Sequence, residues 1–153
     1  MNTSIQNCMV AQSGGPTVAI NASLAGVIKG AAGCYGTVYG SVNGILGILN
    51  EHYLNLSEIM ESDDNALERL IHTPAMYLGS CRFKLPDISK DREIYDKIFD
   101  ILNKMEIKYF FYIGGNDSMD TIKKLSDYSL LNGSDIRFME IPPAHLYRSY
   151  WMN

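Results

Sequence analysis

One stretch of this sequence, from Ile107 to Ile113, is apolar or aromatic along almost its whole length. A strand with one solvated face alternates apolar and polar residues, whereas a strand covered on both faces is apolar throughout. A glycine pair, Gly114-Gly115, ends the stretch, and a helix is predicted from about Ser118 to Leu131. A buried strand followed by a tight turn and a helix is the unit of a parallel α/β sheet.

The same order of strand and helix recurs along the rest of the chain. Further strands are predicted at Asn7 to Gln12, Thr37 to Tyr39 and Asp135 to Ile141. Further helices are predicted from Val18 to about Ala32, from a cap at Ser57 through Ile71, and from a cap at Asp91 through Met105. The glycine-punctuated segment Asn43 to Leu49 predicts a turn. The pattern indicates a three-layer, Rossmann-like α/β domain with a parallel sheet and right-handed crossovers.

Composition narrows the classes of function. The chain has 153 residues, of which 46% are hydrophobic, which is enough for one domain with a core. A net charge of -4 and the lack of a basic stripe argue against a nucleic-acid partner. No apolar run approaches the ~18 residues of a membrane span. The segment Met1 to Gln6 does not resemble a signal peptide, so a cytoplasmic location is expected.

Two glycine pairs, Gly14-Gly15 and Gly114-Gly115, each follow a predicted strand and precede a predicted helix. Ligands of open α/β sheets bind beyond the carboxyl ends of the strands. A helix start offers free N–H groups, and glycine lets a phosphate approach them. The two turns are therefore predicted to face one anionic ligand, the alternative being two ordinary tight turns. Neither is a Walker loop or G-x-G-x-x-G, so a nicotinamide cofactor has little support.

Asp117 and Ser118 stand at the start of the helix that follows the second glycine pair. One interpretation is that they only cap this helix. The other is functional: a carboxylate beside a phosphate-binding turn orders a magnesium ion or excludes a longer phosphate chain. Spacing does not decide between them.

Four segments resemble signatures of the phosphofructokinase family and occur in the family's order. They are Ala11–Ala22, Tyr39–Gly47, Leu78–Phe83 and Ile113–Ser118. The resemblance covers residues 8 to about 142. It implies that the chain has the N-terminal part of the phosphofructokinase fold and that this fold is incomplete. It implies a glycolytic transferase that phosphorylates the 1-hydroxyl of fructose 6-phosphate, with Mg²⁺ as cofactor and a homo-oligomer for the intact protein.

Carried over by position, Gly14, Gly15, Arg82 and the segment Gly115 to Ser118 would bind the phosphates of the donor. A guanidinium suits phosphate oxygens, and a surface salt bridge is the alternative for Arg82. Asn116 occupies a position where many members have a magnesium-binding Asp, so a direct metal contact there is in doubt. Asp117 occupies a position where ATP users carry Gly and pyrophosphate users carry Asp, which favours pyrophosphate as the donor.

After Ile141-Pro142 the chain departs from the family's catalytic segment. Leu146 stands where the catalytic base is expected, and a leucine cannot accept a proton. We interpret residues 1–142 as a partial donor-binding domain and residues 143–153 as an unrelated tail from a frameshift or truncation, or else as part of a short paralogue. The chain is expected to be inactive alone. The alternatives are a fragment of an ATP-dependent phosphofructokinase and a non-catalytic module that binds phosphate or nucleotide.

Overall fold

The sheet of this protein has five strands in the order β3-β2-β1-β4-β5. The computed structural model describes residues 6–13, 18–32, 35–73, 76–79, 81 and 83–142. The strands are β1 (Asn7–Gln12), β2 (Val38–Ser41), β3 (Tyr53–Asn55), β4 (Ile107–Ile113) and β5 (Arg137–Ile141). β1 is parallel to β2 and β4, β4 is parallel to β5, and β3 is antiparallel to β2. The predicted α/β class is confirmed, and the sheet is mixed because of β3.

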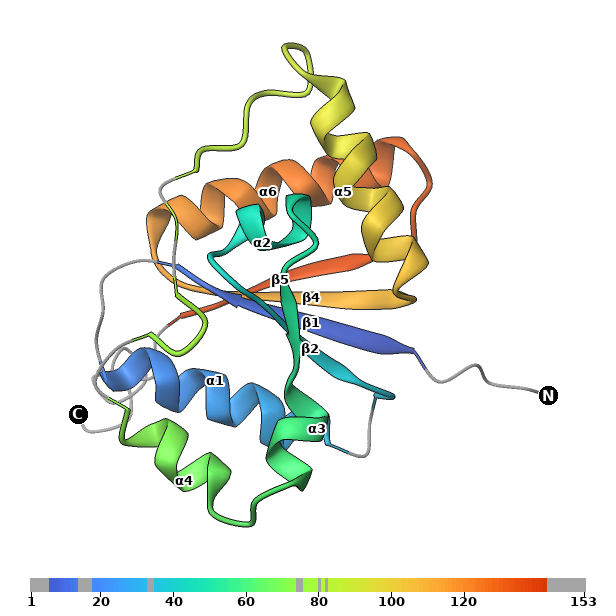
Figure 1. Ribbon diagram of the computed structural model, residues 1–153. Helices are drawn as coiled ribbons and strands as arrows, with labels where there is room; N and C mark the ends of the chain where they lie inside the picture. The colour runs from blue at the N-terminus through green and yellow to red at the C-terminus, as the bar shows by residue number, and fades with distance from the viewer. Residues whose placement is uncertain are drawn as a thin grey trace, which may run out of the picture.

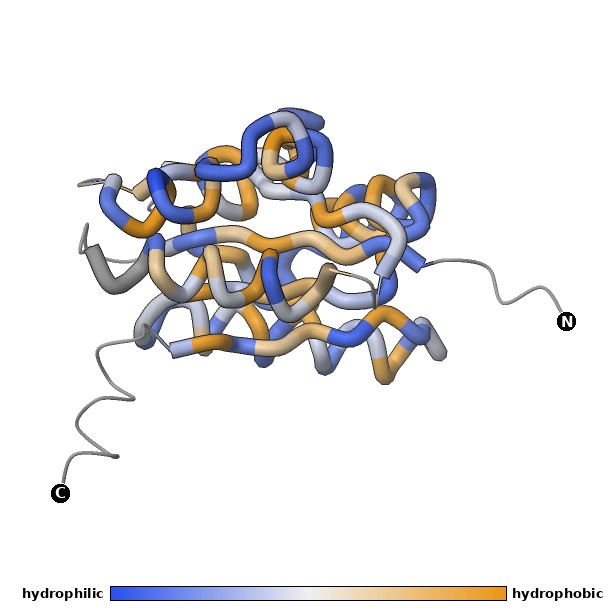
Figure 2. Tube along the Cα trace, turned by 90° about the horizontal axis from the view of Figure 1, so that it is seen from below, coloured by the Kyte–Doolittle hydropathy of each residue, from blue (hydrophilic) through white to orange (hydrophobic). Residues whose placement is uncertain are grey.

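Helices cover both faces of the sheet, which gives three layers (Figure 1). One layer contains α1 (Val18–Ala31), α3 (Leu56–Glu61) and α4 (Ala66–Ile71). The other contains α2 (Ile45–Leu49), α5 (Arg92–Lys104) and α6 (Asn116–Leu131). Hydrophobic and hydrophilic residues alternate along the helices (Figure 2), as expected for helices that bury one side against a sheet.

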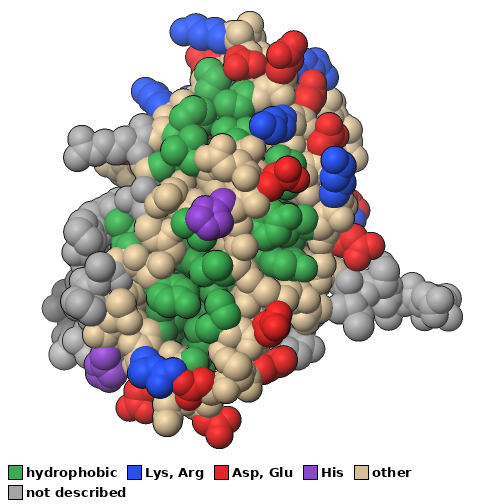
Figure 3. All heavy atoms as spheres, in the orientation of Figure 1, with side chains coloured by type: hydrophobic (Ala, Val, Ile, Leu, Met, Phe, Trp, Pro, Cys, Tyr) green, Lys and Arg blue, Asp and Glu red, His purple; other side chains and the backbone are tan. Residues whose placement is uncertain are grey.

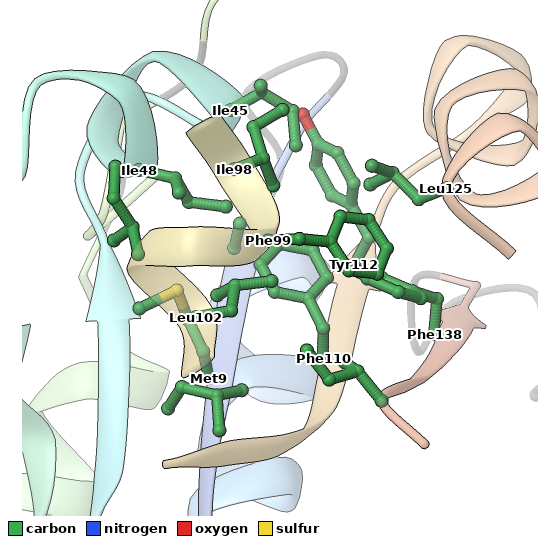
Figure 4. Close-up of a cluster of buried hydrophobic side chains, with 14 of the residues drawn as sticks. Met9, Ile45, Ile48, Ile98, Phe99, Leu102, Phe110, Tyr112, Leu125 and Phe138 are labelled. Carbon is green, nitrogen blue, oxygen red and sulfur yellow. The ribbon is translucent and has the colours of Figure 1, made fainter. Parts of the chain in front are cut away.

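The face under α2, α5 and α6 is filled by a cluster rich in aromatic rings, here called the aromatic cluster (Figure 4). Its centre is Phe110 of β4, which is fully buried. The ring centroids of Phe110 and Phe138 are 5.8 Å apart, and those of Phe99 and Phe138 are 5.5 Å apart. Tilted ring pairs at this separation attract each other beyond the burial of their area.

The face under α1, α3 and α4 is filled by a second cluster with mostly aliphatic buried members, here called the aliphatic cluster. The partly buried rings of Tyr35, Tyr109 and Phe111 pack against it. It contains Cys8, Val10, Leu24, Ala25, Ile28, Ala31, Val38, Leu56, Leu70, Leu78 and Ile113. Side chains of a strand point alternately to its two faces, so β1 contributes Met9 and Ala11 to one cluster and Cys8 and Val10 to the other. These four residues are fully buried, as expected for a central strand covered on both faces.

Most predicted elements are confirmed within a few residues, and three corrections have physical causes. The predicted turn Asn43 to Leu49 contains the short helix α2. Asn55, and not Ser57, caps the next helix, because its side chain accepts a hydrogen bond from the Glu58 N–H at 3.0 Å. The Ser57 hydroxyl instead accepts a hydrogen bond from the Val38 N–H at 2.8 Å.

The third correction concerns the helix predicted to run on to Ile71, which is divided into α3 and α4. The cap at Asp91 is confirmed, since its carboxylate accepts a hydrogen bond from the Ile94 N–H at 3.3 Å. The apolar stripe that begins at Ile94 packs against the aromatic cluster, with Ile98 and Leu102 fully buried.

The surface visible in Figure 3 has hydrophobic side chains from its upper part down towards its lower part, and acidic and basic side chains intermixed at its top, along its right side and at its bottom. None of the helices in the described ranges is long and apolar enough to cross a membrane. The proposed tail, residues 143–153, lies outside the described residues.

Candidate functional site

Three strand ends meet at one edge of the sheet, where β1, β4 and β5 finish and α1 and α6 begin (Figure 1). The Ser13 N–H donates a hydrogen bond to the Ile113 carbonyl at 2.8 Å, and the Gly114 N–H donates one to the Ile141 carbonyl at 3.2 Å. These bonds fasten the starts of both glycine turns to the sheet. Gly14 and Gly15 lie outside the described residues, and so does Arg82.

The second glycine turn packs tightly on the protein side. A Cβ added to Gly114 would lie 2.8 Å from the Ser13 carbonyl oxygen and 2.9 Å from the Ser118 hydroxyl, so only glycine fits there. A Cβ added to Gly115 would meet nothing within 4 Å. Gly115 therefore faces open space at the start of α6, where unpaired backbone N–H groups attract an anion.

The helix-cap interpretation of Asp117 and Ser118 is wrong. Gly115 is the N-cap residue of α6, without a side-chain cap, and Asp117 lies in the first turn of the helix. The Ser118 hydroxyl donates a hydrogen bond to the Gly115 carbonyl at 2.6 Å and is buried. Asn116 and Asp117 are exposed. A carboxylate in the first turn also interacts favourably with the helix dipole, but it does not close the end of this helix.

A pocket of about 430 Å³ opens beside this turn. It is lined by Ser13, Cys81, Phe83, Lys84, Tyr112, Asp117, Asp120 and Thr121. Its charged groups are one ammonium and two carboxylates. Such a set suits an anionic ligand only together with a cation, because the bare anion would be repelled by the carboxylates.

A larger hollow of about 660 Å³ lies between the last turn of α6 and α5. It contains Asp96, Asp100 and Asp135, with no lysine or arginine among its lining residues. It lies away from the strand ends and the helix starts. The chemistry therefore favours the smaller pocket as the candidate site.

Tyr112 lines the candidate pocket, and the residue is almost fully buried. Burial raises its pKa to about 12, and the nearby Asp117 carboxylate acts in the same direction, while a hydrogen bond with the Ser13 side chain opposes both. The phenol therefore stays neutral at ordinary pH and can donate a hydrogen bond. Sequence reasoning missed Tyr112 because it treated the residue only as part of a buried strand.

The second and third signature segments, Tyr39–Gly47 and Leu78–Phe83, also reach the candidate pocket. A Cβ added to Gly44 would lie 2.8 Å from the Tyr112 hydroxyl and 3.0 Å from the Cys81 sulfur. The Asn43 N–H donates a hydrogen bond to the Leu78 carbonyl at 2.8 Å. Parts of all four signature segments thus converge on the pocket. Lys84 and Asp120 are further lining residues missed in the sequence, where their positions gave no signal.

Glu140, near the end of β5, adds a carboxylate next to the turn. The Ser118 hydroxyl lies 3.4 Å from a Glu140 carboxylate oxygen. Burial raises the pKa of Glu140, and the hydrogen bond from Ser118 lowers it. No group of three or more His, Cys, Asp or Glu side chains in the described ranges is arranged to hold a metal ion. Mg²⁺ typically needs only one or two carboxylates when substrate phosphates complete its shell.

A family model described as Phosphofructokinase matches residues 7–144. The chain is 41% identical over 139 residues to the pyrophosphate–fructose 6-phosphate 1-phosphotransferase of Halomonas elongata, covering 89% of this chain and 32% of that protein. It is 34% identical over 118 residues to the ATP-dependent 6-phosphofructokinase of Spiroplasma citri, covering 77% of this chain and 33% of that protein.

Solved structures agree with these relatives. The pyrophosphate-dependent phosphofructokinase of Nitrosospira multiformis superposes with a TM-score of 0.79 at 38% identity, covering 91% of this chain and 34% of that one. The chain thus spans about a third of the length of the relatives that it matches.

Proposed function

Because the chain belongs to the phosphofructokinase family, we propose that it provides the donor-binding site of a pyrophosphate-dependent phosphofructokinase. The proposed reaction transfers a phosphoryl group from pyrophosphate to the 1-hydroxyl of fructose 6-phosphate. One observation carries the choice of donor. Asp117 is exposed in the first turn of α6, lines the pocket beside Gly115, and is not needed to cap the helix.

The start of α6 would receive one phosphate of the donor. Gly115 leaves open space there, and the unpaired N–H groups of the first turn carry a partial positive charge. Gly14, Gly15 and Arg82 are proposed to complete this cradle, as the resemblance to the family implies. Lys84 is the cation among the described lining residues and would approach the same phosphates.

Magnesium fits this arrangement as part of the donor complex. Asp117 and Asp120 line the pocket, and Asn116, which directly precedes Asp117 in the chain, is exposed. We propose that Asp117 holds Mg²⁺ together with phosphate oxygens, with Asn116 in direct or water-bridged contact. The bound ion would neutralise charge on the phosphates during transfer.

Asp117 would also select the donor. As the resemblance to the family implies, a nucleotide would place a further phosphate where this carboxylate lies. Two unit charges about 4 Å apart repel by about 1 kcal/mol in water and by about 4 kcal/mol at an effective dielectric constant near 20. At roughly 1.4 kcal/mol per tenfold, this disfavours ATP by about one to three orders of magnitude.

The catalytic step needs a base that accepts the proton of the sugar hydroxyl. Leu146, at the position expected for this base, lies outside the described residues. Its assignment stays a prediction from the sequence, and a leucine accepts no proton. The proposal is therefore tested by measuring how the chain binds the donor, and not by measuring catalysis.

The test compares the affinities of Mg²⁺–pyrophosphate and Mg²⁺–ATP, measured by titration calorimetry on the purified chain and on Asp117→Asn. We expect the chain to prefer pyrophosphate and Asp117→Asn to gain ATP affinity by about tenfold or more. Asp120→Asn is the matched control, because it removes the same charge one helical turn further along. Equal donor ratios in all three proteins would remove the support for pyrophosphate, and a chain that binds neither donor would refute the site.

A further inference from the structure

Two side-chain amides are fully buried between β1 and α1. Gln12 is the last residue of β1, Asn21 lies in the first part of α1, and neither is exposed to solvent. The Gln12 amide nitrogen donates a hydrogen bond to the Asn21 amide oxygen at 3.2 Å. Buried polar groups cost free energy unless they are paired, so this pair needs its partners.

Three further hydrogen bonds of the pair go to backbone groups of Thr73, Tyr77 and Leu78. The Gln12 amide oxygen accepts a hydrogen bond from the Leu78 N–H at 2.8 Å. The Asn21 oxygen accepts one from the Tyr77 N–H at 3.0 Å, and its nitrogen donates one to the Thr73 carbonyl at 2.9 Å. The two side chains thus pair with three backbone groups: the Tyr77 N–H, the Leu78 N–H and the Thr73 carbonyl. Within the described ranges, none of these three residues belongs to a helix or strand.

Leu78 is fastened from its other side as well. Its carbonyl accepts a hydrogen bond from the Asn43 N–H at 2.8 Å, and its side chain is buried in the aliphatic cluster. Three residues further along, Cys81 lines the donor pocket, followed by Phe83 and Lys84. At the other end of the hydrogen bond between Gln12 and Leu78, Ser13 directly follows Gln12 in the chain and lines the same pocket.

We propose that Gln12 and Asn21 are positioning residues for the donor pocket. The pair holds the backbone of Thr73, Tyr77 and Leu78 against the end of β1, and this fixes the distance between the pocket wall at Ser13 and the wall at Cys81 and Lys84. Neither side chain lines the pocket, so both act through the backbone that they hold. The proposal rests on the proposed function in one respect: the pocket is taken to be the pyrophosphate site.

The test uses two variants of different severity. Gln12→Met keeps the length of the side chain and removes its hydrogen bonds to Leu78 and Asn21. Asn21→Asp keeps an oxygen that can accept from Tyr77 and Gln12 and loses the amide donation to Thr73. Leu102→Ala is the control, because it removes a fully buried side chain from the aromatic cluster on the other face of the sheet.

Three quantities are measured where each variant is still folded: hydrogen exchange of the Leu78 and Tyr77 amides, the alkylation rate of Cys81 by peptide mass spectrometry, and the affinity for Mg²⁺–pyrophosphate. In Gln12→Met we expect Leu78 exchange to accelerate at least tenfold, the Cys81 rate to change severalfold, and affinity to fall about tenfold. Asn21→Asp should show smaller changes in the same direction. Leu102→Ala should lose stability while its Cys81 rate and affinity stay within about twofold.

The outcomes separate the two proposals. If the unmodified chain binds no pyrophosphate, the proposed function fails, and the Cys81 rate alone decides the positioning role. An unchanged Cys81 rate in both variants overturns that role. So does unchanged affinity in Gln12→Met when its Leu78 amide exchanges fast, or an equal loss of affinity in Leu102→Ala. If Gln12→Met does not fold, the same criteria apply to Asn21→Asp.

Discussion

The two faces of the sheet are filled by different kinds of contact. On one face, rings from β4, β5, α5 and α6 pack against each other (Figure 4). On the other face, the buried side chains are mostly aliphatic, with the partly buried rings of Tyr35, Tyr109 and Phe111 packed against them. The amides of Gln12 and Asn21 are fully buried there as well. Ring packing and aliphatic packing tolerate small shifts, whereas hydrogen bonds weaken steeply when they are misaligned. The comparison suggests that the aromatic face mainly supplies stability and that the amide face also sets the geometry of the pocket.

The largest effect is expected from Phe110→Ala, which removes the central ring of the aromatic cluster. Its side chain is fully buried and meets both Phe138 and Tyr112. Loss of a buried Phe costs about 3–5 kcal/mol, through lost transfer free energy and the cavity that remains. Urea unfolding followed by circular dichroism measures this. Leu24→Ala, in the aliphatic cluster, should cost about 2–5 kcal/mol. A loss below about 2 kcal/mol for Phe110→Ala would contradict its place in a packed core.

Alkaline pH should reveal titrating groups on both faces. Burial raises the pKa of Cys8, in the aliphatic cluster, from 9.0 to about 12, and that of Tyr112 from 10.0 to about 12. A raised folded-state pKa means that its stabilising contribution is complete below the unfolded pKa and is lost as pH rises towards the folded one. Stability should therefore fall above pH about 9, by roughly 1.4 kcal/mol per pH unit for each group that titrates in the unfolded chain.

Urea midpoints between pH 7 and pH 11 test this expectation. Cys8→Ala should delay the onset of the loss to about pH 10, because the tyrosines then titrate first in the unfolded chain. Tyr95, also on the aromatic face, has a pKa raised to about 12 by burial and neighbouring carboxylates. An onset that Cys8→Ala leaves unchanged would mean that Cys8 does not contribute.

Helix caps on the two faces should have smaller and similar effects. Asn55 caps α3 on one face, and Asp91 caps α5 on the other. Replacing either by Ala should cost about 1 kcal/mol, because one backbone N–H at the helix start loses its partner. Thermal unfolding of the two variants measures this directly. A loss of several kcal/mol from either would show that the cap also supports packing beneath it.

The smallest effect is expected at the end of α6. Leu130 and Leu131 are 81% and 74% exposed, so neither contributes much to the aromatic cluster. Leu130→Ser should change stability by no more than about 0.5 kcal/mol. A clear loss in the free energy of unfolding would indicate that this leucine is covered in solution, which analytical ultracentrifugation would then detect as self-association.

The periodicity of apolar residues in the sequence was sufficient to predict the long helices and strands. The apolar stretch Ile107 to Ile113 and the stripe that begins at Ile94 predicted β4 and α5, because burial on two faces or on one side leaves a direct trace in the residue order. β3, with three residues, and α2, with five, were missed. Elements of this length show too few residues to establish a pattern of their own, and β3 is specified instead by its pairing with Tyr39 to Ser41 of β2.

The candidate site was predictable only in part. Gly115 and Asp117 were found because a glycine pair after a buried strand implies a helix start that faces ligands. Tyr112 and Lys84 were not, because their role depends on which segments the fold brings together. Gln12 was equally hidden, since a glutamine at a strand end gives no sign that its hydrogen bonds reach Leu78, 66 residues later.

The antiparallel strand β3 has a consequence for how molecules of this protein meet one another. β3 is the outermost strand on its side of the described sheet and has only three residues. An outer strand displays unsatisfied N–H and C=O groups that can template the addition of a foreign strand, and the hazard grows with its length. An edge strand of three residues offers few unpaired N–H and C=O groups. Fibrillar growth should therefore be disfavoured from this side of the molecule, even at high protein concentration.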